Sequence, residues 1–373
     1  MSKFVDLFAG CGGLSLGLEQ AGLSLVFASD IDPICSETYI ANRNLDRSRM
    51  FIGDISDLNR QYGKFSDYFI DVDLVCGGPP CQGFSMANRQ RLIDDPRNAL
   101  YKQYLLFLQK AKPKFFIIEN VKGMLSKIQE VIDDIKIILG DKYDIGFSVF
   151  NAKHFGVPQN RERLIVIGNR IGIPSTVLID NLKEKQSSNV ITLRQAISDL
   201  PQLKPNRIKN KNHIENDDIG YFCVAYQYEQ TPFYLHINGK REIKFLFNHK
   251  NRYNNDRDIE IFKRLPQGGN SLHDSIADIM PYKSRNEIFK DKYFKLKYDE
   301  VCKTITSHMK YDCNMYIHPI QARGLSPREA ARIQTFPDDY VFTGPQNSWY
   351  KQIGNAVPVK FAQVIGEEIA KYL

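Results

Sequence analysis

The chain has 373 residues, of which 43% are hydrophobic and 25% charged, and its formal net charge is +7 at pH 7. This composition is typical of a soluble globular protein with one large and one smaller domain, and no stretch approaches the ~18–20 apolar residues of a membrane span. The cysteines are odd in number and form no CxxC pair, which favours free thiols in a reducing compartment over a disulfide framework. The mild positive charge permits a polyanionic partner without requiring one.

The first part of the chain alternates short apolar runs with segments of helical periodicity. The runs at 4–8, 25–27, 73–76, 115–119 and 164–168 suit strands that are buried on both faces. Apolar residues recur near the helical period at 100–111, 125–139, 327–334 and 359–370. This alternation predicts the α/β class, with a doubly wound, mostly parallel, Rossmann-like sheet.

The residue pattern changes after 171, where Asn, Lys, Arg and Tyr become frequent and periodicity weakens. We therefore expect a catalytic and cofactor-binding domain over 1–171, a second domain with a hinge over 172–342, and a returning segment over 343–373. Within the second domain, 240–264 carries eight Lys or Arg against four acidic residues, with aromatic residues interleaved. That mixture suits a nucleic-acid surface, and a solvated face over a small core is an equal alternative.

Residues 6–17 read DLFAGCGGLSLG, between a strand and a helical segment. Gly10, Gly12 and Gly13 let the backbone turn sharply and approach a ligand beside a helix N-terminus. The spacing matches neither a Walker A loop nor GxGxxG, and the loop has no Lys to hold a phosphate. A Gly-rich strand–helix turn by itself indicates a nucleotide-like ligand only weakly.

Carboxylates follow the next two expected strands. Asp30 or Asp32, in SDIDP, stands where such folds hydrogen-bond ribose hydroxyls, and a helix cap before Pro33 is the alternative. Asp54, in GDI, follows a third short run. Together with the glycine loop, these positions predict an adenosine-containing cofactor.

Residues 76–85, CGGPPCQGFS, follow the expected strand at 73–76. Pro79 and Pro80 restrict the backbone, so the thiol of Cys81 is expected to be rigidly held at the carboxyl edge of the sheet, where open α/β sheets bind ligands. A buried, unreactive cysteine is the alternative. The position favours a reactive thiol at Cys81 and an inert one at Cys76.

Two further groups suit the same edge. Glu119 directly follows a strongly apolar strand, a position that suits proton donation. Arg161 and Arg163, in QNRERL, alternate on one face of the last expected strand and could hold an anion or a developing negative charge. Surface pairing with Glu162 is the alternative for the two arginines.

The segments DLFAGCGGLS, GGPPCQGFS, ENV, QNRER, RGLSPREAARIQTFP and QIGNAVP occur in this order. In this order they resemble the cytosine-5 DNA methyltransferase family, over roughly 1–170 and 318–373. The residues between match no shared pattern, as expected of that family's variable target-recognition region. The resemblance implies methyl transfer to C5 of a flipped-out cytosine in a specific duplex DNA site, through a covalent bond between the cysteine and C6.

The resemblance also implies roles for individual residues. Cys81 would be the nucleophile, Glu119 the carboxyl group facing the cytosine edge, and Arg161 and Arg163 the pair that orients the base. The cofactor implied is S-adenosyl-L-methionine, bound by Phe8, Ala9, Gly10, Cys11, Gly12, Gly13, Leu14, Asp30, Ile31, Asp54, Ile55, Gly78, Pro80, Leu100, Asn355, Ala356 and Val357. The expected DNA contacts are Gln82, Ser85 and Thr304, and the basic stretch at 240–264 adds the candidates Arg241, Lys250, Arg252 and Arg257.

The expected partner is double-stranded DNA, and we expect a monomer in the cytoplasm at the nucleoid, with no membrane association and no resident metal. The family setting implies a prokaryotic restriction–modification system, with a restriction endonuclease as a functional but not physical partner. An orphan methylase fits the sequence equally well. No code links the 172–317 loops to bases, so the DNA site does not follow from the sequence.

Three alternatives remain. The first is a tRNA cytosine-5 methyltransferase on the same scaffold, a subgroup that usually departs from the QGFS ending. The second is a catalytically silent DNA-binding relative. The third is a metal site formed by Cys302, His308, Cys313 and His318, although their spacings follow no familiar zinc pattern.

Overall fold

The structure is a computed structural model that describes residues 1–80, 99–209, 213–281 and 290–373. The chain packs as two compact units. Unit 1 comprises Met1–Phe155, Glu162–Ser188 and Val357–Leu373, and unit 2 comprises Gly156–Arg161 and Asn189–Ala356. The domain boundaries expected from the sequence, after 171 and after 342, stay a prediction.

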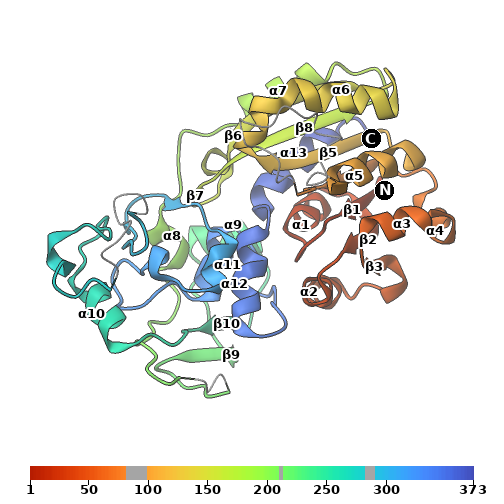
Figure 1. The fold of residues 1–373 in the computed structure, drawn as a ribbon. Helices are drawn as coiled ribbons and strands as arrows, with labels where there is room; N and C mark the ends of the chain where they lie inside the picture. The colour runs from red at the N-terminus through yellow and green to blue at the C-terminus, as the bar shows by residue number, and fades with distance from the viewer. Residues whose placement is uncertain (81–98, 210–212, 282–289) are drawn as a thin grey trace. The chain divides into compact units, whose positions relative to one another are not determined.

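A seven-stranded sheet with the order β3-β2-β1-β4-β5-β8-β6 forms the centre of unit 1 (Figure 1). Its strands are β1 (Lys3–Leu7), β2 (Ser24–Asp30), β3 (Met50–Ile52), β4 (Leu74–Gly77), β5 (Phe115–Val121), β6 (Asp144–Asn151) and β8 (Glu162–Asn169). The neighbours from β3 to β5 pair in parallel, whereas β8 is antiparallel to both β5 and β6. The predicted α/β class with a mostly parallel sheet is confirmed.

The apolar runs of the sequence correspond to the buried strands. Residues 115–118 of β5 are fully buried, as expected for a strand covered on both faces. The edge strand β6 was not predicted, because Gly146 and Ser148 interrupt its apolar residues and most of its side chains are only partly buried. Phe8, predicted to end the first strand, lies outside β1 because its backbone is left-handed, with φ of 58°.

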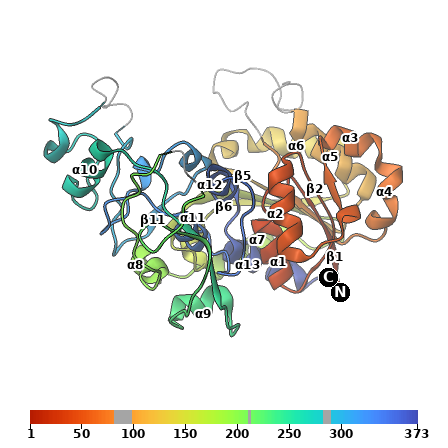
Figure 2. The ribbon, with the colours of Figure 1, turned by 90° about the horizontal axis from the view of Figure 1, so that it is seen from below.

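Helices cover both faces of this sheet. One face carries α3 (Ile55–Arg60), α4 (Tyr62–Phe69), α5 (Ala99–Ala111) and α6 (Ile128–Leu139), and the other carries α1 (Gly13–Gln20), α2 (Pro33–Arg43), α7 (Ser175–Glu184) and α13 (Val359–Ala370) (Figure 1, Figure 2). In the described part of unit 1, the 3₁₀ segments are η1 (Arg47–Arg49), η4 (Lys122–Lys127) and η5 (Ala152–Phe155). The helix predicted over 125–139 thus begins later, at Ile128, because its first turn is 3₁₀. The predicted helices at 100–111 and 359–370 are confirmed.

The C-terminal helix α13 packs closely against α1. A Cβ on Gly17 would lie 2.4 Å from the Val359 carbonyl oxygen, and a Cβ on Gly366 would lie 2.8 Å from the Cβ of Ala21. The two helices therefore approach through their glycines. Phe361, Ile365 and Ile369 are buried on one face of α13, as its periodicity predicts.

Unit 2 is built from shorter elements. Its helices are α8 (Leu193–Ile197), α9 (Pro232–Asn238), α10 (Asp256–Arg264), α11 (Pro327–Ile333) and α12 (Gln346–Asn355). The strands among its described residues form two small sheets, β9 (Gly220–Ala225) with β10 (Phe245–Lys250), and β7 (Gln159–Asn160) with β11 (Cys302–Lys303). Its 3₁₀ segments are η6 (Asp274–Ile276), η7 (Ser307–Lys310) and η8 (Asn314–Tyr316).

The core of unit 2 contains buried charges around α11. Every residue of α11 is buried, and Arg323, Arg328 and Arg332 are fully buried. Arg332 forms ion pairs of 2.5 Å with Asp199 and 2.8 Å with Asp338. Removing one member of such a pair leaves an uncompensated buried charge and costs about 3–5 kcal/mol. These residues therefore specify how the segments of unit 2 fit together.

Two buried histidines belong to the same core. Burial lowers the pKa of His318 to about 3 and that of His249 to about 4. Nδ1 of His318 accepts the backbone N–H groups of Ile320 at 3.2 Å and Gln321 at 3.1 Å, which requires the unprotonated ring nitrogen. Both rings are therefore neutral in the folded protein at pH 7.

These histidines predict acid sensitivity. Below pH ~6.5 the unfolded chain takes up a proton at each position and the folded chain does not, so the free energy of unfolding decreases as the pH falls. At pH 5 we expect a loss of about 2 kcal/mol per histidine, measured by urea unfolding between pH 7 and pH 5. His318→Asn, whose side-chain oxygen can accept the same two N–H groups, should flatten this dependence by about one proton, while the exposed His273→Asn should not. An unchanged slope in His318→Asn would contradict the assignment.

Candidate active site

The glycine loop joins β1 to α1 through three residues with left-handed backbone, Phe8, Gly10 and Gly12, with φ of 58°, 53° and 86°. Asp30, at the end of the neighbouring strand β2, accepts the Gly10 N–H on Oδ2 at 2.7 Å and the Asp32 N–H on Oδ1 at 2.8 Å. Because β1 and β2 are parallel, their carboxyl ends meet at one edge of the sheet. The loop and the Asp30 carboxylate therefore lie side by side, as the sequence predicts for a cofactor site.

The other acidic residues at this edge begin helices. Asp32 accepts the N–H groups of Ile34 at 3.0 Å and Cys35 at 3.4 Å, so the helix cap considered for this position is its structural role. Asp54 caps α3 by accepting the Ser56 N–H at 2.7 Å, and its hydrogen bonds with Ser56 lower its pKa. Asp30 is thus the better placed of the two candidates from SDIDP.

The remaining predicted cofactor residues differ in accessibility. Ile31 is 67% exposed just beyond β2, so its side chain is accessible for an apolar contact with a ligand. Pro80 and Asn355 are also exposed, and Gly78 and Leu100 are partly buried. The buried members are Ala9, Cys11, Gly13, Leu14, Ile55, Ala356 and Val357. Asn355 and Ala356 belong to unit 2, and Val357 begins the last segment of unit 1.

The start of the proline turn is anchored to the end of β5. The Asn120 side chain donates to the Pro79 carbonyl oxygen at 2.9 Å. A Cβ on Gly78 would lie 3.2 Å from Glu119 Oε2, so the backbone of the turn passes close to that carboxylate. Cys81, Gln82 and Ser85 lie outside the described residues.

Glu119 and Arg163 form an ion pair, with 2.9 Å between Arg163 Nε and Glu119 Oε1. Arg163 reaches this edge because β8 is antiparallel to β5, so that the start of β8 pairs with the end of β5 at Val121. The ion-pair contact does not have hydrogen-bond geometry, and the buried Oε1 receives no hydrogen bond from the described residues. Glu119 is therefore a partly buried carboxylate whose inner oxygen faces the positive charge of Arg163.

Arg161 precedes β8 and belongs to unit 2, so the two arginines do not lie on one strand face as predicted. Its side chain is 2% exposed and donates from Nη1 to the Ile305 carbonyl oxygen at 2.8 Å. The neighbouring Thr304 donates from Oγ1 to the Asn160 carbonyl oxygen at 2.6 Å. The pairing of β7 with β11 thus brings the predicted base-orienting arginine and the predicted phosphate contact into adjacent segments.

A buried amide pair that the sequence analysis did not identify supports these segments. Gln159 donates to Gln334 Oε1 at 2.9 Å and accepts the Ile305 N–H at 2.8 Å. Gln334 in turn donates to the carbonyl oxygens of Ile353 at 2.8 Å and Ala356 at 3.2 Å. Gln159 and Gln334 lie inside two of the segments that resemble the family, QNRER and RGLSPREAARIQTFP. Their place in these segments is the feature of the sequence that could have identified them.

The predicted DNA-contacting cations of 240–264 differ in their surroundings. Lys250 is 3% exposed and pairs with Glu215 at 3.1 Å. Arg252 is half-buried and donates to the carbonyl oxygens of Met309 at 2.7 Å and Tyr311 at 2.9 Å. Arg241 pairs with Asp339 at the surface, and Arg257 is exposed on α10. Arg257 and Arg241 are thus the more accessible candidates.

The metal alternative finds no support within the described residues, where no group of three or more His, Cys, Asp or Glu side chains is arranged to hold a metal ion. Cys302, Cys313 and His318 are individually buried. In the part of the chain that the structure describes, no helix is long and apolar enough to cross a membrane.

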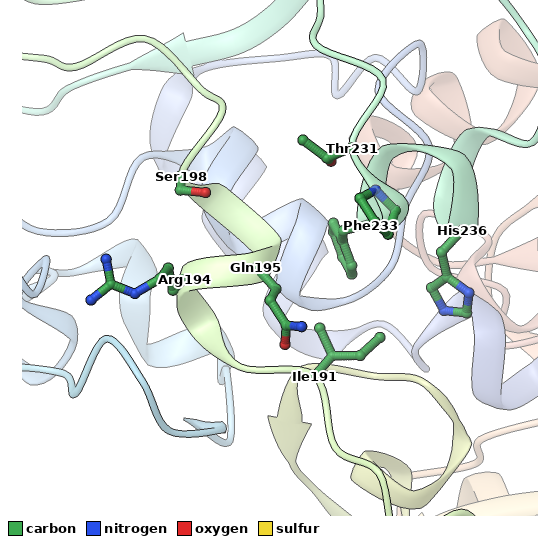
Figure 3. A pocket seen from close by; sticks show the side chains of 8 residues that line it. Ile191, Arg194, Gln195, Ser198, Thr231, Phe233 and His236 are labelled. Carbon is green, nitrogen blue, oxygen red and sulfur yellow. The ribbon is translucent and has the colours of Figure 1, made fainter.

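Unit 2 also contains a pocket of about 480 Å³ between α8 and α9 (Figure 3). Ile191, Gln195, Phe233 and His236 are among the side chains that line it. His236 donates from Nε2 to the Gly156 carbonyl oxygen at 2.9 Å. Among the described residues, none of those predicted for catalysis, cofactor or DNA lines this pocket.

The sheet, the glycine loop and the carboxylates at the carboxyl edge define a protein of the methyltransferase class of α/β folds. The family model described as C-5 cytosine-specific DNA methylase matches residues 2–371, so the chain belongs to this family. It is a DNA (cytosine-5)-methyltransferase.

Relatives agree with this assignment. The chain is 32% identical to the type II methyltransferase M.DdeI of Desulfomicrobium norvegicum, over 99% of this chain and 89% of that protein. It is 31% identical to M.Sau96I of Staphylococcus aureus, over 99% of this chain and 75% of that protein. A solved structure described as a DNA modification methyltransferase of an E. coli prophage matches with a TM-score of 0.74 at 24% identity, covering 100% of this chain and 99% of that one, which shows the fold.

The cysteines predict a pattern of alkylation. Cys76 is fully buried and burial raises its pKa well above the usual range, whereas Cys223 is exposed. Iodoacetamide should therefore modify Cys223 in the native protein and leave Cys76 unmodified until denaturant is added, as read by peptide mass spectrometry. Alkylation of native Cys76 at a rate comparable with Cys223 would contradict its assignment as an inert thiol.

Proposed function

We propose that the enzyme transfers a methyl group from S-adenosyl-L-methionine to C5 of a cytosine that is flipped out of a specific duplex DNA site, through a covalent bond between Cys81 and C6. Its chief support in the structure is Glu119, a partly buried carboxylate that is ion-paired with Arg163 at the carboxyl edge of the sheet, next to the turn that leads to Cys81. The order of the sequence segments and the family membership support the same reaction.

The residues at the carboxyl edge fit the proposed cofactor. The glycine loop at the start of α1 allows a close approach of a ligand to the backbone, since a Cβ on Gly10 would have no heavy atom within 4 Å. Asp30 offers carboxylate oxygens suited to ribose hydroxyls, and the exposed Ile31 offers an apolar surface for an adenine ring. When bound, S-adenosyl-L-methionine supplies the methyl group on a sulfonium.

The chemistry explains the residue types. C5 of cytosine is a poor nucleophile, and addition of the Cys81 thiolate to C6 breaks the aromaticity and makes C5 enamine-like. A proton shared between the Glu119 carboxyl group and ring N3 offsets the charge that develops as the thiolate adds. After methylation, loss of the C5 proton and departure of the thiolate restore the ring. The target must leave the base stack for these groups to reach it.

Arg163 holds the Glu119 carboxylate in place, and N3 and the N4 amino group of the base would complete its hydrogen bonds. Arg161 is proposed to orient the base and Thr304 to contact a phosphate. For DNA binding outside the base site, the exposed Arg257 and Arg241 are the favoured candidates, together with Gln82 and Ser85, which follow Cys81 in the sequence. The target-recognition region is proposed to read the DNA sequence.

The biological setting proposed is a prokaryotic restriction–modification system, in which methylation protects host DNA from a restriction endonuclease. It is supported by relatives named as type II methyltransferases. We propose a monomer that acts in the cytoplasm at the nucleoid and does not bind the endonuclease. Bisulfite sequencing of DNA from cells that express the protein would identify the substrate, the modified base and the site together.

A tRNA methyltransferase on the same scaffold is the second candidate. The family model is described as C-5 cytosine-specific DNA methylase and the relatives at 30% identity or more are named type II methyltransferases, whereas the match to S. pombe Dnmt2 has 16% identity and shows the fold alone. Methyl transfer to duplex DNA and to tRNA should be compared directly. Activity on tRNA alone would overturn the proposal.

A duplex with 5-fluorocytosine at the mapped site should form a covalent adduct with the enzyme in the presence of cofactor, because fluorine cannot leave as a proton does. Cys81→Ala should abolish the adduct on a denaturing gel, and Cys223→Ala, which removes an exposed thiol, should retain it. An adduct formed by Cys81→Ala would show that another group is the nucleophile. A wild-type enzyme that methylates DNA without forming any adduct would exclude the covalent route.

Glu119→Gln keeps the shape of the side chain and removes the shared proton. We expect kcat to fall about 10²–10³-fold, with DNA affinity within about threefold of wild type, by single-turnover methylation and fluorescence anisotropy. Glu162→Gln, which alters an exposed carboxylate that pairs with Lys122, is the matched control and should leave kcat unchanged. A kcat for Glu119→Gln within threefold of wild type would remove this residue from the mechanism.

A further inference from the structure

Arg43, at the end of α2, contacts the glycine loop although it belongs to none of the segments shared with the family. Its side chain is 6% exposed. Nη2 donates to the Gly12 carbonyl oxygen at 2.9 Å and to Ser15 Oγ at 3.0 Å. Nε pairs with Glu19 Oε2 at 2.8 Å. One guanidinium thus joins the loop to two positions of the following helix.

The face of the same guanidinium is also fixed. Arg43 Cζ lies 4.0 Å from the centre of the Tyr39 ring, and the Tyr39 hydroxyl donates to Asp6 Oδ2 at 3.3 Å. Asp6 belongs to β1, so the ring under Arg43 is itself attached to the central sheet. A planar group with several donors can satisfy all these contacts together, whereas the point charge of a lysine cannot.

The backbone conformation of Gly12 and its lack of a side chain allow the contact with Arg43. Its backbone is left-handed, with φ of 86°, and it precedes α1 without a side-chain cap. A Cβ at this position would lie 2.7 Å from Arg43 Nη1 and 2.8 Å from a carbon of the Tyr39 ring. The absence of a side chain at Gly12 therefore lets the guanidinium reach the loop.

The glycine loop is also held by Asp30, which has a different proposed role. The Gly10 N–H donates to Asp30 Oδ2 at 2.7 Å, and Asp30 is the carboxylate proposed to bind ribose hydroxyls. A bound ribose shares the oxygens of Asp30, whereas nothing in the proposed cofactor contacts requires Arg43. Arg43 can therefore hold the loop in one conformation whether or not a ligand engages Asp30.

We propose that Arg43 is a positioning residue for cofactor binding, which fixes the Gly12 carbonyl group and hence the binding-competent conformation of the glycine loop without contacting the ligand. This inference rests on the proposed binding of S-adenosyl-L-methionine by that loop. A loop that is already ordered pays no ordering cost when the ligand binds, so loss of Arg43 should lower cofactor affinity and leave the chemical step intact.

The test is titration calorimetry of the full-length chain with S-adenosylhomocysteine, the product form of the cofactor. Arg43→Gln should raise the Kd about tenfold, which corresponds to ~1.4 kcal/mol. Steady-state kinetics should show a similar rise in the KM for S-adenosyl-L-methionine, with kcat at saturating cofactor and DNA affinity within about twofold of wild type. A purely structural role would instead lower kcat and DNA affinity together.

Two further variants keep the result interpretable. Glu19→Gln leaves Arg43 in place without its ion-pair partner and should raise the Kd about threefold, so it tests the inference even if Arg43→Gln fails to fold. Arg47→Gln breaks an exposed ion pair with Glu37 close to α2 and should leave the Kd unchanged. If Arg43→Gln and Glu19→Gln both bind S-adenosylhomocysteine with a Kd within twofold of the wild-type value, the proposed role of Arg43 is wrong. Absence of binding by wild type would instead overturn the proposed cofactor site.

Discussion

The parallel direction of β3, β2, β1, β4 and β5 is the constraint on which the active-site edge depends. Because each strand ends at the same edge, five segments that are distant in the sequence deliver their following residues to one place. The glycine loop, Asp54 and Gly78 follow β1, β3 and β4, and Asp30 and Glu119 lie near the carboxyl ends of β2 and β5. Because β8 is antiparallel to β5 and starts where β5 ends, it places Arg163 at the same edge of the sheet.

Unit 2 is organised by a different physical principle. Its elements are short, and buried guanidinium groups on and near α11 bind carboxylates and carbonyl oxygens from several segments. Such pairs add little net stability compared with apolar packing, but breaking one of them leaves an uncompensated buried charge. The amide pair of Gln159 and Gln334 extends this directional bonding to the segments that carry Arg161 and the residues before Val357. Hydrogen bonds and ion pairs between side chains and distant segments thus hold unit 2 together, whereas unit 1 is built on a large sheet.

The sequence predicts the structure best where one physical pattern dominates. The apolar run of β5 and the periodicity of α13 identified a buried strand and an amphipathic helix, because burial on both faces or on one face leaves a distinct pattern. The sequence predicts the structure least well where polar residues are buried. The positive charge of Lys250 and Arg252 indicated a DNA-binding surface, but both side chains bond to other groups of the protein. The strand β6 was not predicted, because an edge strand needs no continuous apolar run. Arg43 carried no signal at all, since its importance lies in contacts made across the fold.

The sequence by itself determined the α/β class, the family and the identity of the candidate catalytic groups, because these depend on periodicity and on the order of short segments. The tertiary structure alone decided what each polar group bonds to. It made Asp32 a helix cap and set Asp30 against the glycine loop, and it paired Arg163 with Glu119 while Arg161 bonds to Ile305. The reason is that charge and hydrogen-bonding capacity are properties of a residue, whereas its partner is fixed only when distant segments fold together.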